Sequence, residues 1–346
     1  MKEYIDKIES FELIKNDDWF DYDLKITLKP SFKCNHKCWF CGEYDNNTKT
    51  WTKEQCDVVL LKLKEIPKEK KKIFFYFYGG EPTLSKFWEY LNYEIVKLFP
   101  DKELFIQTHT NLSLPVKRLE KFLIEIHKLK SKTHTIDICN SYHIGKQPVG
   151  EYIKKMDICN RYNSLGFCFF STEIPKKTQM IDEMNQIIKS HPTKLKMKFT
   201  EIENLASNPS IGYEEYVKDK ELVGDDNGKS LEYRYWMKYY PEFQEYFEES
   251  WNFIINNKLK LNYSHVKGNN IHKKFRFMKC ESGLKNIIIN YDMKVYRCND
   301  YSYKNLKYIS LNDLKFEQYL DKCERCVIST CCDGLDHKKT LLSYLY

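Results

Sequence analysis

Three cysteines lie close together in the segment KCNHKCWFCGEY, residues 33–44, at Cys34, Cys38 and Cys41. A structural zinc site takes four ligands, typically from two C-x2-C or C-x2-H pairs, whereas this C-x3-C-x2-C loop supplies three. A cubane iron–sulfur cluster held by three thiolates keeps one iron open for an outside ligand, which is the arrangement that a catalytic cluster needs. The spacing therefore predicts a [4Fe–4S] cluster with an open iron.

The thirteen cysteines of the chain are unevenly distributed. Three lie within residues 34–41, six lie between residues 280 and 332, and the other four are Cys56, Cys139, Cys159 and Cys168. We expect a cytoplasmic protein, in which thiols stay reduced, so this count does not indicate a disulfide framework. The two clusters predict metal binding. The scattered cysteines, Cys56, Cys159 and Cys168 above all, are expected to pack in the core.

Alternating strands and helices must position the first cluster. We expect strands at residues 23–30, 72–82, 103–111, 134–140, 167–174 and 195–202, each followed by a helix except the last. These strands are too apolar to have a wet face, so they predict an α/β fold with a parallel sheet, a partial (β/α)6 barrel of the TIM type. The cysteine loop follows the first strand, which places it at the C-terminal mouth of the barrel, where such folds keep their chemistry.

Composition and breakers suggest four regions: an N-terminal extension (1–22), the barrel (23–203), a connecting region with short helices (204–279) and a small Cys-rich C-terminal iron–sulfur domain (280–346). The net charge of +7 comes from lysines spread along the chain, which is typical of solvated faces. The N-terminus is acidic where a secretory signal would be apolar, and no apolar run reaches the roughly 18 residues of a membrane span. We therefore expect neither a membrane nor a nucleic-acid partner.

The cysteine loop, with Phe40 before its last cysteine, resembles the motif of the radical S-adenosylmethionine superfamily. The resemblance implies that the amino and carboxylate groups of S-adenosylmethionine chelate the open iron. An electron from the cluster then cleaves the sulfonium to a 5′-deoxyadenosyl radical, which abstracts hydrogen from a substrate. A protein such as flavodoxin or ferredoxin would supply the electron.

A second motif of that family lies at the end of the second strand: Gly79, Gly80, Glu81 and Pro82. The glycines would let the backbone approach a ligand, and the carboxylate of Glu81 would accept hydrogen bonds from the ammonium group of S-adenosylmethionine. Thr108 or Thr110 with Asn111, and Ser141, resemble the polar strand ends that face this ligand. The alternative is that they satisfy nearby backbone groups. His109 and His143 are either ligand contacts or solvent-facing, and the sequence names no catalytic acid or base.

The cysteine-rich tail is organised around a predicted hairpin with its turn at residues 290–293, bracketed by Cys280 and Cys298. The tail resembles the SPASM and twitch extensions of the same superfamily, which hold auxiliary iron–sulfur clusters. The matching cysteines are Cys280, Cys298, Cys323, Cys326 and Cys332. A further cysteine of the pattern is replaced by Asp336, so we expect one auxiliary [4Fe–4S] cluster, held by the first four, with Cys331 or Cys332 as a competing fourth ligand. A zinc ribbon with four cysteines is the alternative.

The resemblance implies a substrate that is a peptide or protein side chain, or a small metabolite. Only about 22 residues precede the first strand, so no leader-recognition domain is expected there. One alternative is a radical dehydrogenase of a small sugar-like alcohol. The other, from a different class, is a zinc-stabilised nucleic-acid-binding protein that would use the basic segment at residues 265–279.

Overall fold

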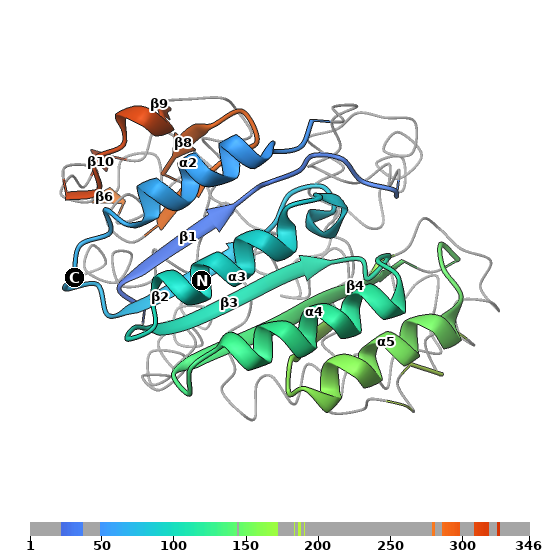
Figure 1. Cartoon of the computed structure of the whole chain (residues 1–346). Coiled ribbons are helices and arrows are strands. Elements are labelled where there is room, and N and C mark those ends of the chain that lie inside the picture. Colours follow the sequence, from blue (N-terminus) through green and yellow to red (C-terminus); the bar gives the residue numbers. More distant parts are fainter. Residues whose placement is uncertain are drawn as a thin grey trace, which may run out of the picture.

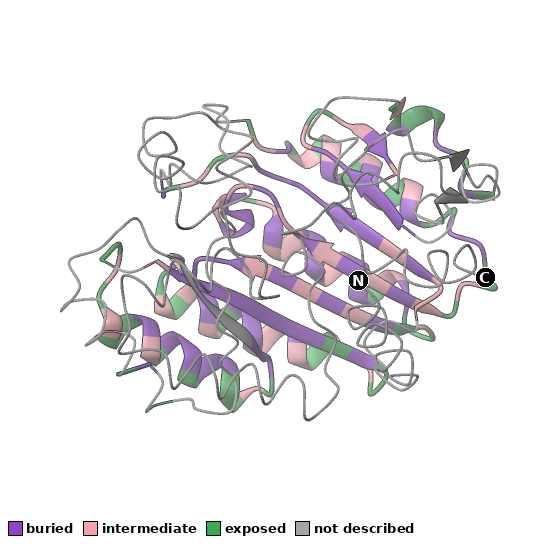
Figure 2. Ribbon diagram, turned by 180° about the vertical axis from the view of Figure 1, so that it is seen from behind, coloured by how far each residue is buried: buried purple, intermediate pink, exposed green. Residues whose placement is uncertain are grey.

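A parallel sheet forms the centre of the protein. Its first five strands follow one another along the chain, and each pairs with the next in parallel register. They are β1 (Leu24–Leu28), β2 (Lys72–Phe77), β3 (Glu103–Thr110), β4 (His134–His143) and β5 (Leu165–Ser171). The connecting helices lie on one face (Figure 1), and the strands form the face seen from behind (Figure 2). The α/β class with a parallel sheet is thereby confirmed.

The computed structural model describes residues 22–36, 49–143, 145–171, 183, 186–187, 190, 279–280, 286–297, 308–317 and 324–325. The expected N-terminal extension, the sixth strand at 195–202 and nearly all of the connecting region lie outside these residues. No helix among the described residues is long and apolar enough to span a membrane.

The helices begin and end where the local sequence indicates. They are α2 (Lys53–Leu63), α3 (Trp88–Leu98), α4 (Val116–Leu129) and α5 (Val149–Arg161). Thr52 and Gln55 form a reciprocal cap of α2, and α4 begins directly after Pro115. α5 ends at Arg161. Gly166 lies in β5, where a Cβ atom would come within 2.6 Å of the Asp137 carboxylate, so this glycine provides space between strands.

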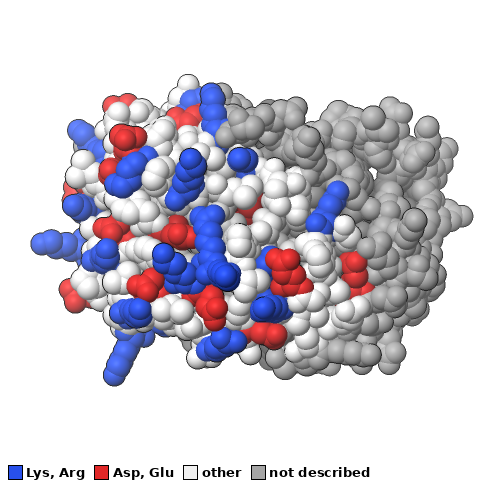
Figure 3. Space-filling view, turned by 45° about the vertical axis from the view of Figure 1, so that its right-hand side comes forward, with Lys and Arg blue, Asp and Glu red and all other residues white. Residues whose placement is uncertain are grey.

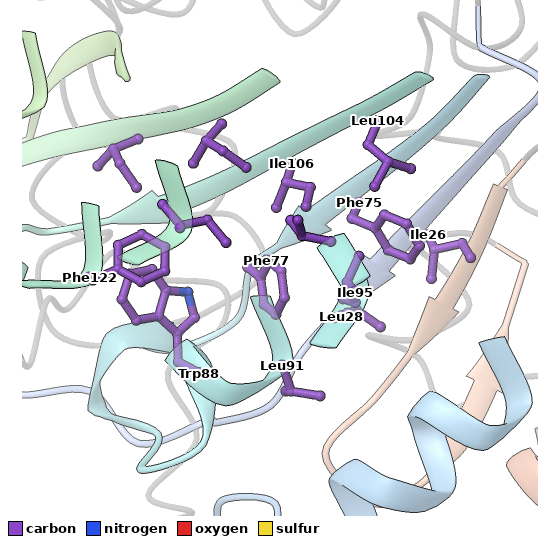
Figure 4. Close-up of a cluster of buried hydrophobic side chains, with 14 of the residues drawn as sticks. Ile26, Leu28, Phe75, Phe77, Trp88, Leu91, Ile95, Leu104, Ile106 and Phe122 are labelled. Atoms are coloured by element: carbon purple, nitrogen blue, oxygen red, sulfur yellow. The ribbon is translucent and has the colours of Figure 1, made fainter. Parts of the chain in front are cut away.

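The hydrophobic core lies between the sheet and the helices (Figure 4). Phe75 and Phe77 of β2 are fully buried, while Phe74 and Tyr76, which alternate with them, are half-buried, because successive side chains of a strand point to opposite faces. The buried face meets α3 at Trp88, Leu91 and Ile95. One face of the sheet therefore packs against the helices. The side chains that alternate with these buried residues point to the opposite face.

The scattered cysteines that the structure describes are packed. Cys56, Cys139 and Cys159 are at most 4% exposed. Burial raises the pKa of Cys56 to about 12, and burial together with the charge of Asp137 raises the pKa of Cys159. The thiols of Cys56 and Cys159 therefore stay protonated and behave as small apolar side chains. Cys168 lies in β5, and its side chain lies outside the described part of the structure.

The C-terminal hairpin extends the sheet beyond β1. β7 (Asn286–Ile289) pairs with β1 in parallel, β8 (Lys294–Tyr296) pairs with β7 in antiparallel, and β9 (Ile309–Ser310) pairs with β8. The expected turn at residues 290–293 is confirmed, with Met293 at φ +62°, a conformation that favours glycine. The hairpin therefore lies beside the strand from which the cysteine loop departs.

Short 3-10 helices follow β2 at Pro82–Leu84 (η2) and β9 at Leu311–Asp313 (η6).

Charged side chains of both signs are mixed over the face shown in Figure 3. The described residues include an exposed ion pair of Lys53 with Asp57 and a half-buried one of Arg118 with Glu89. Such pairs each contribute at most about 1 kcal/mol to stability. On the described part of this face the lysines are interspersed with carboxylates, in keeping with the solvated faces expected from the sequence.

Candidate active site

The cysteine loop leaves the sheet at the carboxyl end of β1. Ser31 and Thr50 form an antiparallel bridge that holds the two ends of the loop together. Trp51 follows the bridge, is 1% exposed, and donates a hydrogen bond from Nε1 to the carbonyl oxygen of Asn290 at 3.2 Å. The two ends of the loop are therefore held next to β1 and to the β7–β8 hairpin.

Cys34 is the one expected cluster ligand of the cysteine loop that the structure describes. The other expected members of the loop lie outside the described residues: Cys38, Phe40 and Cys41. The Sγ atom of Cys34 accepts hydrogen bonds from the backbone N of His36 at 3.4 Å and from Nδ2 of Asn111 at 4.0 Å. Such donors stabilise a thiolate, the form that binds iron. The surroundings of Cys34 therefore fit a cluster ligand. Within the described residues no three His, Cys, Asp or Glu side chains could hold a metal ion together, since Cys38 and Cys41 are not among them.

The glycine turn after β2 packs against the backbone that leads into Cys34. Gly80 N donates to the carbonyl oxygen of Ser31 at 3.0 Å, and Glu81 N donates to that of Lys33 at 2.9 Å. A Cβ atom on Gly80 would overlap the carbonyl group of Phe32. The glycine thus makes room for the chain that carries the cysteine, a use that the sequence did not predict.

Gly79 is needed for two reasons. Its φ of +125° is rarely adopted by other residues, and a Cβ atom there would lie 2.7 Å from the carbonyl oxygen of Ser31. Pro82 then begins η2, the 3-10 helix that ends the turn. The expected contact of this turn with S-adenosylmethionine stays a prediction.

Glu81 is the buried centre of the turn, at 1% exposure. Its Oε1 accepts hydrogen bonds from Thr83 N at 3.1 Å, from Thr83 Oγ1, and from Thr110 Oγ1 at 2.7 Å. Its Oε2 accepts one from Asn111 N at 2.7 Å. Burial raises the pKa of Glu81, and the hydrogen bonds oppose that rise. The carboxylate therefore ties the turn to the end of β3, and its expected bond to a ligand ammonium group stays a prediction.

The structure distinguishes the two threonines at the end of β3. Thr108 Oγ1 accepts a hydrogen bond from Trp88 Nε1 at 3.2 Å and so belongs to the packing between sheet and helix. Thr110 and Asn111 are the residues that reach Glu81. Thr110 is therefore the threonine that contacts Glu81, and which threonine faces S-adenosylmethionine stays a prediction.

Ser141 belongs to a polar network on the other face of the sheet. Its Oγ lies 2.9 Å from Nε2 of His109, and Nδ1 of that imidazole lies 3.0 Å from the hydroxyl of Tyr76. His109 alternates with Thr108 along β3, so the network points away from the helices. Ser141 and His109 are therefore hydrogen-bonded to one another.

The end of β4 lies beside the cysteine loop. The rings of His143 and His36 meet edge to face, with centroids 4.6 Å apart. Burial, aided by the nearby His36 and His109, lowers the pKa of His143 to about 3. The imidazole of His143 is therefore neutral near pH 7 and adds no positive charge beside His36.

Cys280 is the one cysteine of the C-terminal tail that lies among the described residues. It lies in β6 (Lys279–Cys280), which pairs in antiparallel with β10 (Glu324–Arg325) so that Cys280 lies opposite Glu324. Glu324 and Arg325 are the two residues between the cysteines of the C-x2-C segment. The other expected ligands lie outside the described residues: Cys298, Cys323, Cys326 and Cys332.

Three residues that the sequence analysis does not name hold the site in place: Asn35, Gln147 and Lys155. All three hydrogen-bond to the segment at residues 111–113. Lys155 had a usable signal, because it interrupts an apolar helical stripe and a lysine in such a position has to find a buried partner. Asn35 and Gln147 had none, since their partners lie far away in the sequence.

Known proteins share this domain. The Radical SAM superfamily matches residues 28–178, and no curated protein matches the chain. The structure of Streptococcus suis SuiB bound to precursor peptide SuiA is similar, with a TM-score of 0.50 and 14% identity over 93% of this chain and 68% of that one. Histidine-tagged anSMEcpe with bound AdoMet is similar, with a TM-score of 0.53 and 17% identity over 86% and 80% of the two chains. Native anSMEcpe with bound AdoMet and the Cp18Cys peptide is similar as well. Its TM-score is 0.51 and its sequence identity is 13%, over 86% of this chain and 80% of that one.

At these identities the solved structures show a shared fold. The family match covers the cysteine loop, the glycine turn, the end of β3 and the end of β4, which together make the site. The family implies a [4Fe–4S] cluster and S-adenosylmethionine. The cysteine motif, the parallel sheet and the family match therefore agree, and residues 28–178 of this chain match the Radical SAM superfamily.

Proposed function

We propose that Cys34, Cys38 and Cys41 hold the cluster that the family implies. We propose further that the following residues bind or position S-adenosylmethionine: Phe40, Gly79, Gly80, Glu81, Pro82, Thr110, Asn111 and Ser141. The observation that supports this best is the hydrogen-bonded path from Cys34 through Asn111 to Glu81. When bound, the cluster would supply the electron that cleaves S-adenosylmethionine to the radical that abstracts hydrogen from the substrate. Flavodoxin or ferredoxin is the proposed electron donor.

We also propose one auxiliary [4Fe–4S] cluster. Its proposed ligands are Cys280, Cys298, Cys323 and Cys326, with Cys331 or Cys332 as a competing fourth. The pairing of β6 with β10 supports this set, because it brings the backbone of Cys280 to the C-x2-C segment. Asp336 stands where the family pattern has a further cysteine, so the tail lacks the ligands for two complete clusters.

The number of clusters is tested by counting iron and sulfide in the anaerobically reconstituted full chain. We expect about eight of each per chain, and about four of each after Cys34, Cys38 and Cys41 are all replaced by alanine, since a cubane cluster holds four irons. Zinc in place of iron in that variant, or about eight irons still present, would contradict the proposed tail site.

We propose a peptide or protein side chain as the substrate. SuiB binds a precursor peptide and anSMEcpe binds the Cp18Cys peptide in structures that share this fold. A peptide digest of a perdeuterated proteome should therefore transfer deuterium into 5′-deoxyadenosine during turnover, as measured by mass spectrometry. A pool of perdeuterated sugar alcohols is the control. Deuterium transfer from the alcohols and not from the peptides would contradict a peptide substrate.

A further inference from the structure

Asn111 connects three parts of the site through its backbone. The residue follows directly on β3 and is 5% exposed. Its backbone N donates to Oε2 of Glu81 at 2.7 Å, which joins it to the glycine turn. Its carbonyl oxygen accepts a hydrogen bond from Nε2 of Gln147 at 2.8 Å, which joins it to the segment between β4 and α5. Both backbone groups of Asn111 are therefore used inside the protein.

The side chain of Asn111 is equally engaged. Its Oδ1 accepts from Ser113 N at 2.9 Å, while its Nδ2 donates to Oδ1 of Asn35 at 3.0 Å and to Sγ of Cys34 at 4.0 Å. A carboxamide nitrogen carries two hydrogens, and these two acceptors use both. The side chain therefore links the end of β3 to the start of the cysteine loop. Both N–H groups of its carboxamide are used in this link, so neither is available to a ligand.

The segment after Asn111 is held in place by a hydrogen bond from α5, which fixes the position of Asn111. Leu112 has a φ of +52°, an unusual conformation for a branched side chain, and its carbonyl oxygen accepts from Nζ of Lys155 at 2.8 Å. Lys155 is 2% exposed and is paired with Glu151 at 2.8 Å. A buried, charge-assisted hydrogen bond of this kind is among the stronger ones in proteins. The position of Asn111 is therefore set from α5 as well as from β3.

Hydrogen bonds to cysteine sulfur are one of the factors that set the reduction potential of an iron–sulfur cluster. Reduction adds negative charge to the cluster and its thiolates, and a donor aimed at a sulfur stabilises that charge. Cys34 has two such donors in the described structure, the backbone N of His36 and the side chain of Asn111. The side chain is the one that a substitution can remove.

We propose that Asn111 is a positioning residue that fixes Cys34 to the glycine turn and, through its N–H···S hydrogen bond, raises the reduction potential of the cluster. The inference rests on the proposed function, because it takes Cys34 to be a cluster ligand. It differs from the role that the sequence predicted for Asn111, which was direct contact with S-adenosylmethionine.

The test is a redox titration of the reconstituted full chain followed by electron paramagnetic resonance. The signal of interest is the one that is missing from Cys34→Ala. Asn111→Asp is the main variant, because it keeps the backbone bonds and the acceptor for Ser113 N while replacing the donor to Cys34 by a carboxylate oxygen. Ser113→Ala is the matched control: its Oγ donates to Asn35 at 3.2 Å, and the Asn111 donor to Cys34 remains.

We expect the midpoint of this cluster to shift to a more negative potential in Asn111→Asp, and to shift less far in Asn111→Ala, which adds no negative charge. The midpoint of Ser113→Ala should equal that of the wild type. Loss of the cluster from Asn111→Asp alone, with full iron in Ser113→Ala, would also support the proposal that Asn111 positions Cys34. A wild-type midpoint with full iron in both Asn111 variants would overturn the proposal. Equal iron in the wild type and in Cys34→Ala would instead overturn the proposed role of Cys34.

Discussion

Alanine at Cys34, Cys38 or Cys41 is expected to abolish the reductive cleavage of S-adenosylmethionine. In the proposed site, the loss of one of the three thiolates would leave two to hold the cluster, and the cluster would supply the electron for cleavage. The measurement is the anaerobic formation of 5′-deoxyadenosine and methionine with dithionite as reductant. The loss should reach the detection limit in each of the three variants, because each thiolate is required for the same cluster.

Cys56→Ala is the control for these variants. Cys56 lies in α2, just after the cysteine loop, and is fully buried and packed, so its removal tests whether any nearby thiol has the same effect. We expect this variant to retain both the cluster and the cleavage activity. Cleavage at the wild-type rate in all three loop variants would show that the loop does not hold the catalytic cluster.

Alanine at Gly80 is expected to displace the cysteine loop and to reduce the iron content. The added Cβ atom would overlap the carbonyl group of Phe32 and lie 2.7 Å from that of Lys33, the residue before Cys34. Backbone cannot move aside as a flexible side chain would, so the strain should cost about 1 to 3 kcal/mol of folding free energy. The loop should also shift away from the geometry that holds its cluster. Iron content and the thermal midpoint of unfolding measure the two effects.

Gly150→Ala is the matched control. Gly150 lies in the first turn of α5 and is exposed, and a Cβ atom there would meet nothing within 4 Å. Alanine in a helix is more stable than glycine by about 0.5 to 1 kcal/mol, so this variant should unfold at the same or a higher temperature. Its iron content should equal that of the wild type. Full iron and unchanged stability in Gly80→Ala would contradict the close packing between turn and loop.

The glycine turn and the cysteine loop therefore act as one unit in the described structure. Glu81 accepts hydrogen bonds from the end of β3, and the turn itself donates to the backbone that leads to Cys34. An active site that must hold a reactive group in place benefits from supports of this kind, because they cost no reorganisation when a ligand binds.

The features that could be predicted from the sequence are those set by neighbours along the chain. The cap of α2 needs Thr52 and Gln55 three residues apart, and the hairpin turn before β8 lies between two short apolar runs. The spacing of Cys34, Cys38 and Cys41 likewise fits within one loop. Local geometry determines such features, so they can be read without knowledge of the fold.

Other features were decided only by the tertiary structure. The roles of Glu81 and Asn111 follow from a parallel register that brings the ends of β1, β2 and β3 to one edge. Lys155 finds its acceptor, the carbonyl oxygen of Leu112, only once the fold brings α5 to the segment that follows β3. The hairpin residues 286–296 join β1 although most of the chain lies between them. The same glycine or carboxylate can serve a ligand or its own backbone, and only the atoms that the fold brings near decide which hydrogen bonds it makes.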